Sequence, residues 1–487
     1  MPLVDENIVD NKELNILEAL IPILVVVGLL SYNIFFADGA LLGDYSNHYI
    51  LLVGGLVAAI VGLYNKTTVS QIIQEVIGNL KSVLIPITIL MLVGALAGTW
   101  LVSGIIPTMI YYGLKILNPT IFLPATVVIS SVISLATGSS WTTSATVGIA
   151  LIGIGQAIGM PSGMIAGAVI SGAYFGDKMS PLSDTTNLAP AMAGTDLFTH
   201  IRYMTITTVP SIIVTLVIFI ILTFVTDTSG STDVSSLLVS LDSDFNISPI
   251  LFAVPVIVVA LIVMKTKPLI ALLIGVLLAA VFALIFQPDI IASITGAESL
   301  HIGSAISGLA TAIFTETSVE SDNETLRDLL SSGGMIGMMW TIFLIIAAMI
   351  FGGVMDGIGA LSRISKALLS MATSVFGLFA STVASALALN ITASDQYLAI
   401  VVPGKMFSQA YADKNLAPEN LSRTLEDAGT VTSVLIPWNT CGAYQSSVLG
   451  VSVADYFFYA IFNWLSPFMT LLVAGFSIKI KMLVEKR

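Results

Sequence analysis

The sequence predicts an all-α polytopic membrane protein. Of its 487 residues, 56% are hydrophobic and only 10% are charged, whereas roughly 25% are charged in soluble domains. The apolar runs, such as 16–36 and 206–225, have the length of a helix that crosses a bilayer. An outer-membrane barrel would instead show strands of about ten residues with alternating polar and apolar side chains. The apolar content suffices for at most about a dozen spanning helices.

The same apolar runs place the individual spans. At 65–81, apolar side chains recur at helical spacing beside polar ones, which indicates either an interfacial helix or a linker. The expected spans are 16–36, 48–65, 83–103, 120–136, 163–179 with 182–195, 203–226, 248–265, 268–287, 333–353, 372–390, 417–436 with 440–452, and 455–477.

Composition excludes several functional classes. One cysteine and three histidines are too few for a disulfide framework or a zinc cluster. The net charge of −12, with acidic tracts at 227–244 and 289–328, makes nucleic acid an unexpected partner. The apolar segments hold no nucleophile–base pair and no metal-ligand set, so the sequence predicts neither an enzyme nor a cofactor. The acidic N-terminus lacks the basic region of a signal peptide, and the first span is expected to remain in place.

The distribution of basic residues predicts the orientation. Cytoplasmic loops carry an excess of lysine and arginine, so the basic loops are placed inside, which puts both termini in the cytoplasm and the acidic loops outside. The expected location is the cell inner (cytoplasmic) membrane, with the lipid bilayer around the protein. The basic positions are Lys66, Lys81, Arg202, Lys265, Lys267, Arg363, Lys366 and 479–487.

The sequence also shows signs of an internal duplication. Four residues of the first half recur in the second half at offsets of 256 to 259 residues, and the matched spans run in opposite directions. Inverted repeats of this kind build secondary transporters, whose sites lie where discontinuous helices of both halves meet. The matched residues are Pro161, Gly172, Pro181 and Asp196 with Pro418, Gly429, Pro437 and Asp455. The expected parts are a cytoplasmic segment 1–15, a first repeat 16–226, an extracytoplasmic linker 227–247, a second repeat 248–478 with an acidic insert 288–332, and a cytoplasmic tail 479–487.

Two polar interruptions predict the tips of re-entrant hairpins. The first lies in the apolar stretch 121–158, which is too long for one crossing and has no charged loop. Hydroxyl groups there would satisfy exposed backbone groups and offer oxygen ligands; the alternative is small-residue helix packing. The predicted tip residues are Thr137, Ser139, Ser140 and Thr142 in the first half, and Asn390, Thr392 and Asp395 in the second.

The segment 176–190 is the most informative one. It places Asp177, Lys178 and Asp184 after a glycine-rich apolar helix, and each charge at the bilayer centre costs about 2.5–3.5 kcal/mol on insertion scales. Pro181 breaks the helix and frees carbonyl groups. With the hydroxyls of Ser180, Ser183 and Thr185, these oxygens suit Na⁺ better than softer metals. Alternatively, Asp177 and Lys178 form a structural pair at a helix end.

The segment 435–441 is the counterpart in the second half. Pro437 matches Pro181, and Asn439 and Thr440 stand where the first half has Ser183 and Asp184. A neutral side chain thus replaces a carboxylate, which predicts one titratable centre. Glu426 and Asp427 precede this break, and we expect them to be solvated acids at the cytoplasmic end in preference to a proton relay.

These motifs resemble those of the NhaC sodium/proton antiporter family. The resemblance rests on 176–189, 435–443 and 138–143 and extends over roughly 16 to 478. It implies a scaffold part, a transport part with two re-entrant hairpins and two broken helices, an elevator-like movement and, as in many members, a homodimer. Some members of this family exchange organic acids, such as malate with protons against lactate with Na⁺, and Lys178 could hold a carboxylate or balance charge.

The expected mechanism is competition at one carboxylate. Asp184 is predicted to bind either Na⁺ or H⁺, which requires that burial raise its proton affinity, while Asp177 assists the cation. Asn439 and Thr440 complete the predicted site. An organic-acid exchanger and a channel remain as alternatives. The sequence leaves open the stoichiometry, the oligomeric state and the roles of the two acidic tracts.

Overall fold

The computed structural model of this protein describes residues 8–36, 41–43, 45–116, 119–226, 234–321 and 323–483. These residues are almost entirely helical, and their one sheet pairs β1 (Thr317–Ser318) with β2 (Ser331–Ser332) in antiparallel fashion. Seven helices in the described ranges are long and apolar enough to cross a membrane, or eight if a pair bent by 86° counts as one span. The prediction of an all-α polytopic membrane fold is therefore confirmed.

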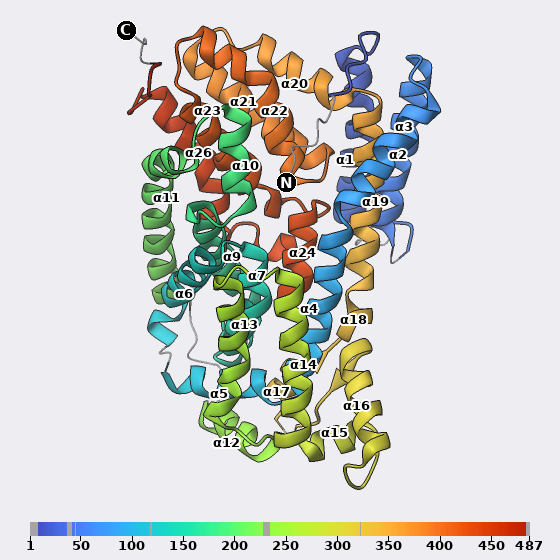
Figure 1. The fold of residues 1–487 in the computed structure, drawn as a ribbon, viewed down its shortest axis with the longest axis vertical. Coiled ribbons are helices and arrows are strands. Elements are labelled where there is room, and N and C mark those ends of the chain that lie inside the picture. Colours follow the sequence, from blue (N-terminus) through green and yellow to red (C-terminus); the bar gives the residue numbers. More distant parts are fainter. Residues whose placement is uncertain are drawn as a thin grey trace.

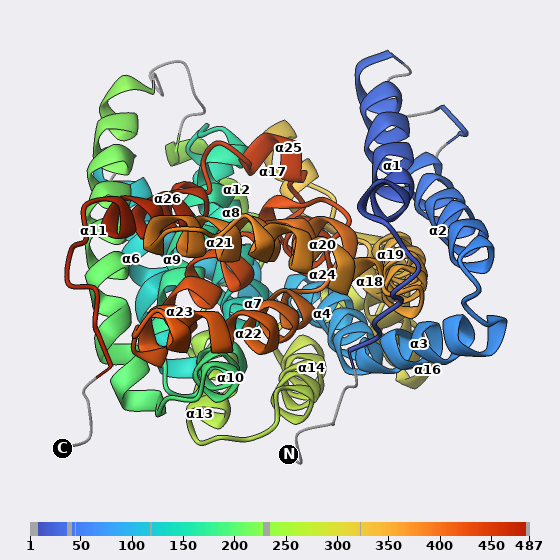
Figure 2. The same ribbon diagram turned by 90° about the horizontal axis from the view of Figure 1, so that it is seen from above.

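Four helices form one side of the molecule, at the right in Figures 1 and 2. They are α1 (Ile16–Phe36), α2 (Ser46–Tyr64), α3 (Val69–Ser82) and α19 (Met339–Gly357). Glycines allow α3 and α19 to pack closely, because a Cβ on Gly353 would lie 2.7 Å from the Cα of Val76. The predicted interfacial helix at 65–81 corresponds to α3, which Thr68 caps by accepting a hydrogen bond from the Gln71 N–H.

The middle of the chain supplies a second group of helices and a set of short ones. The acidic tract 289–328, for which the sequence predicts no elements, forms helices at the bottom of Figure 1 and the strand β1. The longer elements are α4 (Leu84–Val102), α5 (Ile105–Ile116), α14 (Pro268–Phe286) and α16 (Ile302–Phe314). The shorter elements are α12 (Val234–Asp244), α13 (Ala253–Val263), α15 (Pro288–Ile294), α17 (Glu324–Leu329), α18 (Gly334–Gly337) and α20 (Ala360–Ser370).

The first hairpin joins α6 (Phe122–Thr137) to α7 (Ser140–Thr143), a π-helical turn at Ser144–Gly148 and α8 (Ile149–Ala157). The chain reverses direction at Gly138, because Gly155 near the end of α8 lies against the ring of Phe122 at the start of α6. Polar residues thus form the tip, and apolar residues form both arms.

The second hairpin joins α21 (Val375–Thr392) to α22 (Gln396–Asp413). Here Phe379, near the start of α21, contacts Tyr411, near the end of α22, with ring centroids 5.4 Å apart. The intervening residues 393–395 form the tip. Both predicted hairpins are therefore present as helical hairpins, whereas their re-entrant course in the membrane stays a prediction.

Each hairpin is followed by a broken helix. The first consists of α9 (Ser162–Met179) and α10 (Asp184–Ala193), separated by a segment that contains Pro181. The second consists of α23 (Pro418–Leu425), a π-helical segment η4 (Glu426–Thr430) and α24 (Thr440–Leu449), with Pro437 in the break. Proline removes a backbone donor and clashes with the preceding turn, so both predicted breaks occur where the sequence places them.

A further helix follows each broken helix: α11 (Leu197–Val225) in the first half, and α26 (Ile461–Gly475), after the short α25 (Val453–Tyr456), in the second. The two pack together, on the left of Figures 1 and 2. The order hairpin, broken helix, further helix therefore occurs twice. The opposite orientation of the two copies, the predicted boundaries of the parts and the sidedness of the loops stay predictions, and residues 227–233 of the linker lie outside the described residues.

Candidate functional site

The first hairpin tip contacts the first helix break. Ser140 donates two hydrogen bonds to one carboxylate oxygen of Asp177, from its N–H at 3.0 Å and from its hydroxyl at 2.7 Å. Gly138 adopts a left-handed φ of +70°, and a Cβ there would lie 2.6 Å from the Cβ of Leu182 in the break. Only glycine permits this close approach without strain. The tip therefore holds Asp177 near the point where α9 ends.

Hydroxyl groups line the first break. Thr186 donates from its hydroxyl to the carbonyl oxygens of Asp177 (3.2 Å) and Lys178 (3.1 Å), which satisfies carbonyls that the break frees. The hydroxyls of Ser183 and Thr185 are 3.2 Å apart, and Ser183 also lies close to the Asp177 carboxylate. Ser180 is buried and accepts a hydrogen bond from the Leu182 N–H. The predicted oxygen-rich environment is therefore present.

The two predicted carboxylates have different surroundings. Asp177 is half-buried, whereas Asp184, the first residue of α10, is exposed. The expectation that Asp184 is buried is wrong for this conformation, although its neighbours Ser183 and Thr185 are buried. Since a carboxylate does not face lipid, we infer that this edge of the break faces water. The two carboxylates are close enough for their charges to interact.

The second hairpin tip contacts the second break in the same way. The Asn439 amide donates to the backbone oxygen of Asn390 at 3.1 Å and to its side-chain oxygen at 3.2 Å. The Thr440 N–H donates to the Ser394 carbonyl at 2.9 Å. Asp395 is buried and caps α22, accepting hydrogen bonds from the backbone of Tyr397. In this half, neutral groups make the tip-to-break contacts that Asp177 makes in the first.

Several predicted tip residues have local roles. Ser139 accepts a hydrogen bond from the Thr142 N–H and caps α7, and the Thr142 hydroxyl donates back to Ser139 at 3.1 Å. Thr137 and Thr392 are buried, and their hydroxyls donate to backbone carbonyls one turn earlier on their own helices. These four residues shape the tips, whereas Ser140 and Asn390 reach the breaks.

A buried ion pair joins the two halves. The Lys178 ammonium pairs with the Asp427 carboxylate, and both side chains are 0% exposed. The Thr470 hydroxyl on α26 donates to the other oxygen of Asp427. The alternative pairing of Lys178 with Asp177 is wrong, since each has another partner, and Lys178 is not free to hold a substrate carboxylate.

The residues Glu426 and Asp427 contradict their predicted place. Both are 0% exposed, so the interpretation as solvated acids at the cytoplasmic end is wrong. They lie in η4 at the centre of the second broken helix, which packs against α10, α21 and α26. The requirement that a buried lysine has a partner indicates from the sequence that some acid must be buried with Lys178, without indicating that this acid is Asp427.

An aromatic contact also crosses between the halves. The ring of Trp141 in the first tip stacks on Tyr444 of α24, with centroids 3.9 Å apart and planes at 16°. The Tyr444 hydroxyl donates to the Trp141 carbonyl at 3.1 Å. The sequence analysis missed both residues. Figure 1 shows α7, α9 and α24 near the middle of the molecule.

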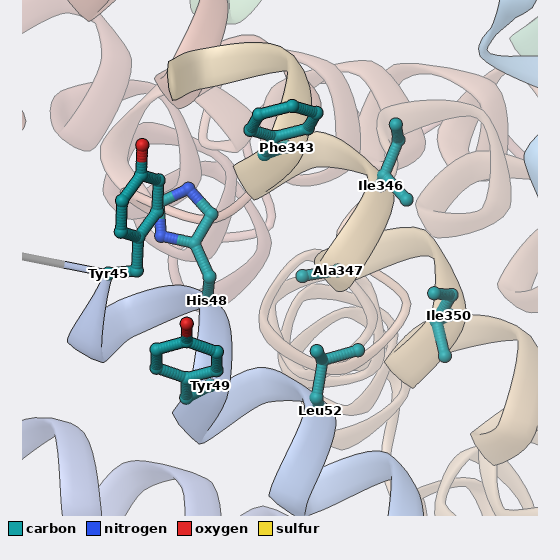
Figure 3. A pocket seen from close by; sticks show the side chains of 8 residues that line it. All are labelled: Tyr45, His48, Tyr49, Leu52, Phe343, Ile346, Ala347 and Ile350. Carbon is teal, nitrogen blue, oxygen red and sulfur yellow. The ribbon is translucent and has the colours of Figure 1, made fainter. Parts of the chain in front are cut away.

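A hollow of about 340 Å³ lies elsewhere, between α2 and α19. Figure 3 shows its lining, in which Tyr45, His48 and Tyr49 face Phe343 and Ile350. No tip or break residue contributes to it. We place the candidate site instead at the first tip and break, where Ser140 contacts Asp177.

The donor set at the breaks limits what can bind. Within the described ranges, no group of three or more His, Cys, Asp or Glu side chains lies together as a metal site requires. A cation at Asp177 would instead be held by one or two carboxylates with hydroxyl and carbonyl oxygens. Such hard oxygen ligands suit hard cations.

The fold and the paired tips and breaks define an all-α polytopic membrane transporter. The sequence profile of the Na⁺/H⁺ antiporter family matches residues 172–478. The chain is 40% identical to the Na⁺/H⁺ antiporter NhaC of Alkalihalophilus pseudofirmus, over 87% of this chain and 89% of that one. It is 36% identical to NhaC of Bacillus subtilis, over 82% of this chain and 86% of that one. This chain belongs to the Na⁺/H⁺ antiporter family.

Two further likenesses are more distant. The malate-2H⁺/Na⁺-lactate antiporter of Bacillus subtilis is 34% identical, over 92% of each chain. Among solved structures, the chain matches MtrF of Neisseria gonorrhoeae, whose structure and function illuminate a class of antimetabolite efflux pumps. The match has a TM-score of 0.35 and 12% sequence identity, over 94% of this chain and 95% of that one. A structural likeness this weak adds nothing to the assignment.

Proposed function

We propose that this protein is a secondary transporter that exchanges Na⁺ for H⁺ across the cell inner membrane, with both termini in the cytoplasm. It moves ions and catalyses no chemical step. The supporting observation is the contact of Ser140 with Asp177, which joins a hairpin tip to a helix break around one half-buried carboxylate. Membership of the Na⁺/H⁺ antiporter family supports the same substrates.

Exchange follows from competition for the Asp177 carboxylate. When ionised, this group would hold Na⁺ together with the hydroxyls of Ser140, Ser183 and Thr185. When protonated, it would lose most of its attraction for the cation. A carrier that changes its exposure only when loaded with one ion or the other then couples the two fluxes. Asp184, at the exposed edge, would attract the cation to this place, which modifies the original prediction that Asp184 is the central ligand.

The second half would keep the site at a single titratable centre. Asn439 and Thr440 occupy the matching break, and their hydrogen bonds go to the second tip. We propose that they hold the second tip against the second break and do not exchange protons. The possible homodimer implied by the family resemblance stays a prediction.

The test is Asp177→Asn in everted vesicles. When Na⁺ is added outside vesicles with an acidic lumen, wild type should alkalinise the lumen, because H⁺ leaves as Na⁺ enters. Asp177→Asn should abolish this response while the folded protein remains in the membrane. Asp242→Asn, on the exposed face of α12, is the matched control and should retain exchange. Unchanged exchange by folded Asp177→Asn would refute the assignment.

Ser140→Ala gives a graded test of the same contact. A hydrogen bond to a charged group contributes about 1.5–3 kcal/mol, so its loss should shift the Na⁺ concentration or the pH at half-maximal exchange by roughly tenfold or more. A Na⁺ dependence and a pH dependence identical to those of wild type would contradict the proposed role.

Organic-acid exchange is the alternative, favoured by the malate/lactate relative. The two functions differ in what they require. In proteoliposomes, Na⁺ alone should dissipate a pH gradient if the proposal is right. A need for a dicarboxylate in the same assay would instead support organic-acid exchange.

A further inference from the structure

Glu426 is a buried carboxyl group that the exchange at Asp177 does not use. It begins the π-helical segment η4, is 0% exposed, and neither of its oxygens has a hydrogen-bond partner in the described part of the chain. The Thr430 hydroxyl, four residues on, likewise has no partner and lies near enough to interact with this carboxyl group.

An ionised carboxylate is costly to bury without a partner, whereas its uncharged form is tolerated far better. The nearby cations do not pair with Glu426. Lys178 pairs with Asp427, and the Arg423 guanidinium lies over the rings of Tyr203 at 4.7 Å and Phe379 at 5.9 Å. In the conformation described, Glu426 therefore fits the structure in its protonated form.

The surroundings of Glu426 also include a positive charge that can stabilise its ionised form. Lys178 and the acids Asp177 and Asp427 are close enough for their charges to act on it. Of the helices packed against η4, α21 and α26 carry no titratable side chain. The others carry Asp184 on α10; Tyr397, Lys405, Tyr411 and Asp413 on α22; and Glu419 and Arg423 on α23. Among all of these charged groups, Lys178 is the cation that pairs with Asp427, the carboxylate adjacent to Glu426 in the sequence.

We propose that Glu426 carries a transported proton of its own, separate from the exchange of Na⁺ and H⁺ at Asp177. This inference rests on the proposed function. The Glu426 carboxylate takes up a proton on one side of the membrane and becomes a neutral carboxyl group. On the other side the same O–H bond breaks, the proton leaves, and Lys178 is shared between the Asp427 and Glu426 carboxylates.

The consequence is a change in stoichiometry. One proton on Asp177 and one on Glu426 would move against one Na⁺, so each cycle would transfer one net charge. At zero voltage, a tenfold proton gradient would then balance a Na⁺ gradient of about a hundredfold. A carrier that uses Asp177 alone would balance at about tenfold.

The experiment measures this balance point in proteoliposomes held at zero voltage with K⁺ and valinomycin. A tenfold proton gradient is fixed, and the Na⁺ gradient is varied until no net flux remains. Wild type should balance at about a hundredfold Na⁺ gradient, and Glu426→Gln, which imitates the protonated form, at about tenfold. Glu426→Asp, which keeps a carboxyl group, should stay near a hundredfold.

Glu419→Gln is the matched control, because Glu419 lies on the same helix and pairs with Lys481 near the C-terminus. It should balance as wild type does. The proposal is overturned if Glu426→Gln balances at the wild-type gradient, if the folded variant exchanges nothing, or if wild type itself balances at tenfold. Should Glu426→Gln fail to fold, the wild-type and Glu426→Asp balance points decide. Complete absence of Na⁺-driven proton flux in wild type would instead refute the proposed function as well.

Discussion

The buried pair of Lys178 and Asp427 allows the sharpest test of how the two halves are held together. Both side chains are 0% exposed, so neither is screened by water. Removing one partner of such a pair leaves an uncompensated buried charge and typically costs about 3–5 kcal/mol. Lys178→Gln or Asp427→Asn should therefore destabilise the protein by this amount, although Thr470 continues to hydrogen-bond residue 427.

The double variant Lys178→Gln with Asp427→Asn should recover part of the loss, because two facing amides carry no net charge. The coupling energy between residues in direct contact is about 0.5–3 kcal/mol. At roughly 2 °C per kcal/mol for a large domain, each single variant should lower the Tm in detergent by roughly 6–10 °C, and the double variant by less than the sum.

The exposed pair of Lys66 and Glu13 provides the control. Its side chains are 79% and 52% exposed, and exposed ion pairs contribute about 0–1 kcal/mol. Lys66→Gln should therefore change the Tm by at most about 2 °C. If Lys178→Gln behaves like Lys66→Gln, or if the effects of the single variants simply add, the buried pair does not stabilise the junction as argued.

Three further predictions concern the tips and the helix ends. Gly138→Ala should lower both the Tm and the exchange rate, because its left-handed φ and the 2.6 Å approach to the break exclude a Cβ; Gly78→Ala, with open space around it, should do neither. Tyr444→Phe should cost about 1 kcal/mol through its lost hydrogen bond to Trp141, and a Tm loss as large as that of Tyr444→Ala would contradict this. Hydrogen bonds from the start of α11 lower the pKa of Asp196, so its ionised form stabilises the fold above the ordinary aspartate pKa of about 4. The Tm difference between wild type and Asp196→Ala should be full at neutral pH and shrink as the pH falls below that value; a constant difference would contradict the role of the charge.

Local features of the fold could be predicted from the sequence. The breaks at Pro181 and Pro437 follow from the missing backbone donor and the steric clash of proline, and both appear in the structure. The tip at Gly138 was likewise visible as a polar interruption between apolar arms. In each case the responsible residue and its consequence lie within a few positions of one another.

Pairings between distant parts of the chain were not predictable in the same way. Lys178 and Asp427 are 249 positions apart, and helical periodicity indicates which face of a helix is apolar without indicating which distant helix covers it. The acids Glu426 and Asp427 were placed in water because their sequence neighbourhood carries no sign that α21 and α26 cover them. The exposure of Asp184 between the buried residues Ser183 and Thr185 depends on the three-dimensional course of the break.

The last described residues have a practical consequence for expressing this protein. The segment that ends at Leu483 runs antiparallel to residues 415–417, with the Ala417 N–H donating to the Lys481 carbonyl at 2.9 Å. The Lys481 ammonium also neutralises Glu419, which is only 5% exposed. A purification tag or fluorescent fusion that replaces these residues would leave a buried acid and a backbone donor unsatisfied at the start of α23. Fusions should therefore be attached beyond Leu483, so that Lys481 can still bind Ala417 and Glu419 at the start of α23.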